Sequence, residues 1–343
     1  MAKSAGERAI LKEEKREKRE KKRRIEQANK MLIPVSKKTN LSLGIISFDP
    51  EGTFRLTDKR WMKVFEADGD VCNLMEIMRN LLGRIRMTMH LGADSGRDIC
   101  HVSLMETGEI YEEVRQQMKR DEEILRKELS LRAMSVDEVM NQISSNSFKD
   151  IRFSYASYVR GNKDWKKECF VESTKKEDSF VMNRNYGECF VALSYPSIIQ
   201  ADLIGRLRES GCRMIVGLDL NALTSEEQKD FTRAIEKRYN VKIPENMEED
   251  YINVSLALGI ICDSDDARKI VEQTIVSLYA NAGVMLAPAY HMQTKVLESM
   301  LSLGLLDAKT MRNIKLDVAR GLLGGESDAD AKIKLDISHC LSI

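Results

Sequence analysis

Eight of the ten residues from Lys15 to Arg24 are basic. Lysine and arginine at this density attract nucleic acid or an anionic membrane surface through long-range electrostatics, without base specificity. Residues 12–30 contain no aromatic side chain that would stack on bases, which weakens the hypothesis of single-strand binding. A solvated extension that binds nothing is the alternative. The candidate anion-binding residues are Lys15, Arg16, Lys18, Arg19, Lys21, Lys22, Arg23 and Arg24.

Nucleotide chemistry has no matching motif in the chain. Neither the phosphate-binding pattern GxxxxGK[ST] nor the dinucleotide pattern GxGxxG occurs. The glycine-rich stretch that starts at Gly321 reaches Glu326 where the phosphate loop needs lysine. Asp219 follows an apolar run, as a Walker-B aspartate does, but without the phosphate loop that pattern is common in α/β proteins. We therefore expect no nucleotide-binding residues.

Metal and nucleophile chemistry are equally unsupported by the spacing. The four histidines lie far apart, and neither HxxxH nor CxxC occurs. The acids at Asp263, Asp265 and Asp266 suit a helix N-terminus, whose unpaired N–H groups and dipole favour negative charge. No GxSxG element is present. The sequence thus predicts no catalytic residue, no metal site and no cofactor, and we expect a protein that is not an enzyme.

Composition sets the broad class of the protein. The chain has 343 residues, 43% apolar and 31% charged, which is typical of a globular protein of about two domains. The longest nearly apolar run, Val254–Cys262, is about half the length that a membrane-spanning helix needs. Seven scattered cysteines predict free thiols in a reducing compartment, and hence a cytoplasmic protein. Residues 1–30 carry 12 Lys/Arg and 6 Asp/Glu, so a cationic arm of +6 precedes a body of −6.

The hydrophobic pattern predicts an α+β fold. In the first half, the turn at Asp49–Gly52 indicates a hairpin, alternation over 85–91 indicates a strand, and residues 71–82 and 106–130 have helical periodicity. In the second half strands and helices follow one another as β-α-β, a helical insert and β-α-β, over 186–195, 198–207, 213–220, 224–238, 254–262, 267–282 and 284–287. That order is typical of a ferredoxin-like split βαβ sandwich. Residues from Ser302 onward are expected to be helical at first.

These elements predict four segments. Residues 1–38 form a basic arm, helical or flexible, and residues 39–150 form an α+β subdomain that contains the hairpin. Residues 151–308 form the ferredoxin-like α+β domain with its helical insert, and residues 309–343 form a C-terminal helix and loose tail. The capping boxes Ser135/Glu138 and Thr224/Glu227 predict the starts of two helices.

Several short motifs, in order over roughly residues 41–305, resemble a known family. They are Gly44–Phe54 with Thr57–Phe65, Phe190–Ser197, Val254–Asp266, Gln293, and Leu301–Gly304, in which Ser302 replaces a proline. Together they look like the amino-terminal, non-motor region of the conjugative-transfer ATPases of type IV secretion systems. The positions that carry the resemblance are Gly52, Phe54, Trp61, Tyr195, Pro196, Gln293 and Gly304.

The resemblance implies a role in DNA transfer by a bacterium or its mobile element. In that family the motor domain with its phosphate loop follows this region, whereas here the sequence ends about forty residues later. The implied function is a non-catalytic docking or regulatory component that binds channel subunits and a separate motor ATPase. Its basic arm would suit the anionic inner face of the cell membrane, which implies a cytoplasmic protein that associates peripherally with the membrane.

Two other functions remain open at the level of sequence. A nucleic-acid-binding accessory protein would act through the basic arm. An enzyme of unrecognised type would need a deep pocket lined by convergent polar groups.

Overall fold

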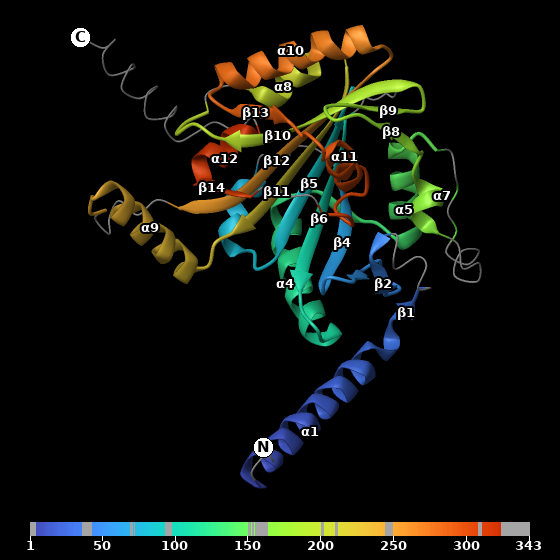
Figure 1. The fold of residues 1–343 in the computed structure, drawn as a ribbon, viewed down its shortest axis with the longest axis vertical. Coiled ribbons are helices and arrows are strands. Elements are labelled where there is room, and N and C mark those ends of the chain that lie inside the picture. Colours follow the sequence, from blue (N-terminus) through green and yellow to red (C-terminus); the bar gives the residue numbers. More distant parts are fainter. Residues whose placement is uncertain are drawn as a thin grey trace.

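The computed structural model describes residues 5–35, 43–68, 71, 73–92, 98–149, 152, 154, 164–199, 202–209, 212–243, 250–307 and 311–323. Within them the fold is α+β, as the sequence predicts: one large antiparallel sheet carries helices on both faces (Figure 1). The predicted tail beyond residue 323 lies outside the described residues.

The strands cover both halves of the chain. They are β1 (Ile33–Pro34), β2 (Ile45–Phe48), β3 (Phe54–Leu56), β4 (Arg60–Ala67), β5 (Arg84–Leu91), β6 (Ile99–Thr107), β7 (Leu131–Ala133), β8 (Ser173–Lys175), β9 (Phe180–Met182), β10 (Asn185–Ser194), β11 (Arg213–Ala222), β12 (Tyr251–Cys262), β13 (Met285–Pro288) and β14 (Arg312–Lys315). The helices are α1 (Ala5–Ala28), α3 (Leu74–Ile77), α4 (Tyr111–Glu128), α5 (Val136–Asn146), α7 (Trp165–Cys169), α8 (Leu203–Glu209), α9 (Ser225–Tyr239), α10 (Asp265–Asn281), α11 (Gln293–Leu301) and α12 (Leu316–Leu322), with 3₁₀ turns at Asn29–Met31 and Met78–Asn80.

The sheet runs without a break from the first half of the chain into the second. Its strand order is β1-β2-β3-β4-β6-β5-β11-β12-β10-β9-β8, and β13, β14 and β7 pair with β10, β12 and β4. The two halves meet where β5 pairs with β11. In the second half the neighbours lie in the order β13-β10-β12-β11, all antiparallel.

Two hydrophobic cores lie on the two faces of the sheet. One contains apolar residues of α3, α4, α8, α10 and α12, and the other contains those of α5, α7 and α11. Because side chains alternate along a strand, β5 sends Ile85 and Met87 into the first core and turns Arg84 and Arg86 toward the second. That alternation positions the candidate site described below.

Helix α1 extends away from the body and carries the N-terminal end of the chain (Figure 1). Most of its residues are charged and its side chains from Lys12 to Arg24 are exposed, so it contributes little to either core. None of the described helices is both long enough and apolar enough to cross a membrane.

The local helix signals are confirmed. Ser135 accepts a hydrogen bond from the backbone N–H of Glu138, whose carboxylate accepts from the Ser135 N–H at 2.7 Å. Thr224 and Glu227 make the same reciprocal pair at the start of α9. Each capping box satisfies backbone donors that an isolated helix end leaves unpaired.

Two expected helices differ from the structure. Residues 74–80 form only the short α3 and a 3₁₀ turn, and Leu81 is extended with a ψ of 140°. Beyond this point Asp121 Oδ2 accepts from the backbone N–H groups of Leu82 and Gly83 at 2.8 and 2.7 Å, so the helix does not continue. The expected helix from Ser302 is also wrong. Leu303 and Gly304 have φ of 55° and 97°, which ends α11, and Arg312–Lys315 pairs with β12 as a strand before the short α12.

Candidate functional site

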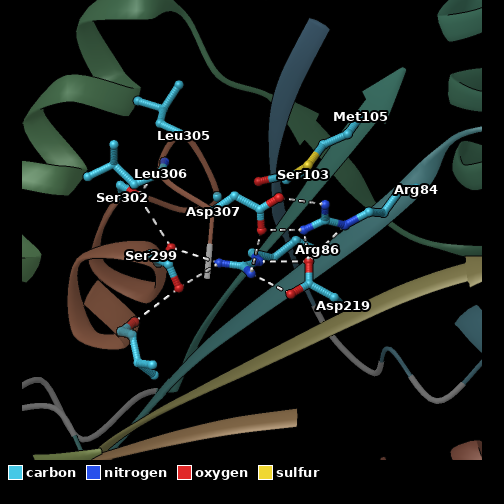
Figure 2. Close-up of polar contacts among 12 residues, drawn as sticks. Arg84, Arg86, Ser103, Met105, Asp219, Ser299, Ser302, Leu305, Leu306 and Asp307 are labelled. Carbon is cyan, nitrogen blue, oxygen red and sulfur yellow. Dashed lines mark hydrogen bonds and ion pairs between the residues drawn. The ribbon is translucent and has the colours of Figure 1, made fainter. Parts of the chain in front are cut away.

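Four charged side chains meet between the centre of the sheet and the end of α11 (Figure 2). Arg84 Nη2 lies 2.5 Å from Asp219 Oδ1, and Arg84 Nη1 lies 3.1 Å from Asp307 Oδ2. Arg86 donates from Nε to Asp219 Oδ1 at 2.9 Å and forms a second bond through Nη2. We call Arg84, Arg86, Asp219 and Asp307 the junction.

The strand register explains how the junction forms. Arg86 and Asp219 are direct cross-strand partners in the antiparallel pair of β5 and β11. Arg84 is two residues from Arg86 and therefore lies on the same face. Asp307 comes from the turn after α11 and completes a balance of two positive and two negative charges.

Burial makes this balance important for stability. Arg86 and Asp219 are each 2% exposed, and an isolated charge at that depth is strongly disfavoured. Burial alone would raise the pKa of Asp219, but Arg86 and Arg84 outweigh it and hold that pKa below its ordinary value. Burial likewise opposes the charge on Arg84, yet Asp219 and Asp307 raise the Arg84 pKa. Asp219 and Arg84 are therefore both ionised at neutral pH.

The junction also fixes the chain that follows α11. Arg86 Nη1 donates to the carbonyl of Ser299 at 2.9 Å. Nearby, Arg60 donates to the carbonyls of Gly304 and Leu305, both at 3.1 Å, and Ser103 Oγ donates to Leu303 at 2.7 Å. The Ser299 carbonyl lies in the last turn of α11, where carbonyls lack intrahelical partners, and the other three carbonyls belong to the turn that follows the helix.

Close contact at this turn requires glycine. A Cβ on Gly304 would lie 2.4 Å from Met105 Cε and 3.1 Å from Arg86 Cδ, and the φ of 97° disfavours other residues as well. On the facing strands, a Cβ on Gly217 would lie 2.9 Å from Met300 Cγ. Small residues on the sheet thus let α11 and its turn approach the backbone closely.

The N-terminal end of α11 is fixed by uncharged bonds. Gln293 Oε1 accepts from the backbone N–H of Cys189 at 2.6 Å, and its Nε2 donates to the Cys189 carbonyl at 3.0 Å. Gln293 therefore bonds to β10 as a neighbouring strand would. Together with the junction, this fastens α11 at both ends across one face of the sheet.

The contacts of the junction support a structural role, in which its side chains attach α11 to the sheet, rather than a catalytic one. Its guanidinium groups are occupied by carboxylates and main-chain carbonyls. Across the part of the chain that the structure describes, no group of three or more His, Cys, Asp or Glu residues is arranged to hold a metal ion. A cavity of about 280 Å³ lies between β4 and α4, where Lys63 and Glu122 are already paired at 2.7 Å.

The eight basic residues predicted from the sequence all lie on α1 and are all exposed. Lys21 Nζ lies 2.7 Å from Glu109 Oε2, which joins the helix to the turn before α4. Hydrogen bonds and charge from Lys21 and Lys59 lower the pKa of Glu109 to about 2. Within the arm, Arg16 pairs with Glu20 at 3.1 Å and Lys22 with Glu26 at 3.8 Å.

The seven positions that carry the family resemblance do not form one site. Phe54 and Trp61 are fully buried, and Trp61 Nε1 donates to the carbonyl of Gly108 at 3.0 Å. Gly52 has a φ of 89° in the turn between β2 and β3. Tyr195 Oη accepts from the backbone N–H of Leu256 at 3.2 Å, on another part of the sheet.

Pro196 packs closely against Gly283. A Cβ atom on Gly283 would lie only 2.8 Å from the Cβ of Pro196. Gln293 and Gly304, described above, share the α11 segment. The seven residues therefore fix backbone geometry at three separate places.

Sequence reasoning missed the junction. It considered Asp219 only as a Walker-B-like aspartate, whereas the structure pairs it with two arginines. The available signal was the alternation Arg84-Ile85-Arg86 at the start of a strand, which puts two cations on one face of an apolar element. The partner could not be deduced, because Asp219 is distant in sequence.

The comparisons with known proteins do not assign this chain to a family. No family model and no curated protein matches the chain. Among solved structures, the chain is similar to 6-hydroxy-D-nicotine oxidase from Arthrobacter nicotinovorans, with a TM-score of 0.30 and 12% sequence identity over 66% of this chain and 44% of that chain. The chain thus spans less than half the length of that protein, and a likeness this low carries no argument about fold or activity.

Proposed function

We propose that this chain is a non-catalytic docking component of a bacterial conjugative transfer machine of the type IV secretion class. Its body would bind channel subunits and a separate motor ATPase. The observation that carries the proposal is the double attachment of α11. In the family that the sequence resembles, Gln293 and Leu301–Gly304 correspond to the end of the regulatory region, immediately before the motor domain. In this chain that segment is fastened to the sheet by Gln293 and by the junction.

This attachment suits a surface that receives a motor. A motor docked beside the α11 turn would act on a segment bonded directly to β5, β6 and β10, so that a force on the turn reaches the central sheet. Because packed cores transmit strain rather than absorb it, the body would respond as a unit.

We also infer that residues 185–288 form a ferredoxin-like split βαβ unit with α9 as its insert. The strand order β13-β10-β12-β11 supports this inference, as does the packing of α8 and α10 on the same face. The basic arm would hold this body at the anionic inner surface of the cell membrane.

Affinity purification from the membrane fraction of the native cell tests the docking role. Two baits are compared, the full chain and a chain that begins at residue 29, and the captured proteins are identified by mass spectrometry. We expect both baits to recover a phosphate-loop ATPase or channel subunits of a secretion machine. If neither bait recovers them above an untagged control, the docking role is wrong.

The exposed helix α1 favours a second function, nucleic-acid binding. Fluorescence anisotropy with labelled duplex and single-stranded DNA tests it over a range of salt concentrations. If the arm binds DNA, the logarithm of affinity should fall linearly with the logarithm of salt concentration, by about 0.9 for each phosphate that the arm neutralises on duplex DNA. Removal of residues 1–28 should abolish that binding, and undiminished binding by the shortened chain would exclude the arm as its cause.

A further inference from the structure

Two cysteines that are far apart in the sequence lie opposite each other at one end of the sheet. Strands β11 and β12 pair antiparallel, with Arg213 opposite Ile261 as their last partners at this end. One residue further, the same register places Cys212 opposite Cys262. The sequence alone shows scattered cysteines, and both of these cysteines are in the thiol form in the structure, but the strand register brings them together.

The geometry of this pair fits a disulfide. Opposite residues in an antiparallel pair have Cα atoms about 4.5–5.5 Å apart, and disulfides span about 4.4–6.8 Å. The two thiols are within hydrogen-bonding reach of each other, and both side chains pack against the same hydrophobic core. A bond between them therefore needs rotation of the side chains rather than movement of the strands.

The two thiols differ in their access to solvent. Cys212 is half-buried, whereas Cys262 is 6% exposed. Burial, followed by the neighbouring Cys212, raises the pKa of Cys262 to about 11, which keeps it a neutral thiol at physiological pH. Because thiolates are the attacking species in disulfide exchange, Cys212 is the residue that an oxidant meets first.

We propose that Cys212 and Cys262 form a reversible dithiol–disulfide pair whose oxidant is a low-molecular-weight disulfide of the glutathione class. The Cys212 thiolate attacks one sulfur of glutathione disulfide and releases one glutathione thiolate, which takes up a proton. Cys262 then loses its proton and attacks Cys212 Sγ, which releases the second glutathione. The pair gives up two electrons and two protons, and the oxidant becomes two molecules of glutathione. This proposal is independent of the docking role.

The bond would join two neighbouring strands of the sheet immediately before α10. It would close the chain from β11 through α9 to β12 into a covalent loop, which restricts the unfolded state. The oxidised protein should therefore melt at a higher temperature than the reduced protein, and a reductant should reverse that shift.

Peptide mapping of the full chain tests the proposal. The purified, reduced protein is incubated with glutathione disulfide, its remaining thiols are alkylated under denaturing conditions, and its peptides are identified by mass spectrometry. We expect one cross-linked peptide that joins Cys212 to Cys262, lighter than its two free parts by the mass of two hydrogen atoms. If the two cysteines of the treated protein are alkylated separately, or if only a glutathione adduct on Cys212 accumulates, the proposal is wrong.

Two variants and a matched control separate the steps. Cys262→Ser should stop the reaction at a stable glutathione adduct on Cys212, and Cys212→Ser should leave Cys262 reduced. Cys100→Ser removes another half-buried thiol, from β6, and should leave the cross-link unchanged. Loss of the cross-link in Cys100→Ser would contradict the assignment. If a variant folds poorly, the peptide map of the unmodified chain still shows whether Cys212 and Cys262 become cross-linked.

Discussion

The junction and the basic arm contain the same kinds of side chain in opposite surroundings. At the junction the side chains of Arg84 and Arg86 are 10% and 2% exposed, and the side chain of their partner Asp219 is 3% exposed. On the arm, Arg16 is 77% exposed and its partner Glu20 is 57% exposed. Ion pairs occur in both regions, so the presence of a pair does not by itself distinguish them.

The difference lies in what happens when one partner is removed. A buried charge that loses its partner stays away from water and destabilises the fold by about 3–5 kcal/mol. An exposed charge regains water, and many exposed pairs contribute nothing measurable. Salt also screens exposed pairs far more than buried ones. The junction should therefore control stability, and the arm should control only what binds to it.

The largest expected effect is that of Asp219→Asn. This substitution preserves shape but leaves Arg84 and Arg86 to share one carboxylate, Asp307, which lies 3.1 Å from Arg84 and 4.0 Å from Arg86. We expect the free energy of unfolding to fall by about 3–5 kcal/mol in urea titrations followed by circular dichroism.

Asp230→Asn is the matched control. Asp230 pairs with Arg233 on α9 at 3.2 Å, where both side chains are more than 60% exposed. Its substitution should leave the urea midpoint nearly unchanged. Equal losses for the two variants would refute the contrast between buried and exposed pairs.

The next prediction concerns the N-terminal end of α11, which is attached by uncharged hydrogen bonds. It tests whether these bonds contribute as much to the free energy of unfolding as the charged junction does. Gln293→Leu keeps a good helix former but leaves the buried N–H of Cys189 without its side-chain acceptor, while the Cys189 carbonyl keeps its bond from the Ala289 N–H. An unsatisfied buried group costs about 1–3 kcal/mol, so we expect a loss of about 2 kcal/mol in the same titrations. The control Lys295→Ala changes an exposed position of α11 and should cost far less. A loss as large as that of Asp219→Asn would mean that charge is not what distinguishes the junction.

These two ends of α11 also show what the sequence could predict. Strand β5 follows from local alternation and strands β11 and β12 from apolar runs, and the capping boxes of α5 and α9 depend on residues three positions apart. The junction depends on strand order, which places β5 from the first half beside β11 from the second. No local pattern encodes that contact. The end of the helix predicted over 71–82 also involves a distant residue, since Asp121 from α4 accepts from the N–H groups of Leu82 and Gly83.

An intermediate effect on the free energy of unfolding is expected at Glu106, a buried carboxyl group whose charge is not balanced. Burial and the neighbouring Asp121 raise the pKa of Glu106 to about 8, against about 4.3 in an unfolded chain. The folded protein therefore favours neutral Glu106, so this contribution to stability is present below about pH 4.3 and is lost as the pH rises through 8. We expect Glu106→Gln to stabilise the protein at pH 8.5 by at least about 1.4 kcal/mol, the equivalent of one pKa unit.

The measurement for Glu106 is the slope of unfolding free energy between pH 5 and pH 8.5. The stability of Glu106→Gln relative to the unmodified protein should rise steadily over this range, because only the unmodified protein must ionise a buried Glu106. Asp219→Asn should show no such relative rise, because the pKa of Asp219 is lowered and its contribution disappears only in acid. Parallel profiles for Glu106→Gln and the unmodified protein would show that Glu106 is charged in the folded state.

The smallest effect on stability belongs to the arm. The triple variant Lys15→Gln, Lys18→Gln and Arg19→Gln should leave the urea midpoint unchanged, because all three side chains are exposed on α1. Its binding to vesicles that contain acidic lipid should weaken by about 1 kcal/mol per charge removed. Replacing Lys229, Lys237 and Lys242 by Gln, at exposed positions on and after α9, removes the same net charge elsewhere. Equal weakening by both variants would assign vesicle binding to net charge rather than to the arm, whereas a destabilised arm variant would show that α1 supports the body.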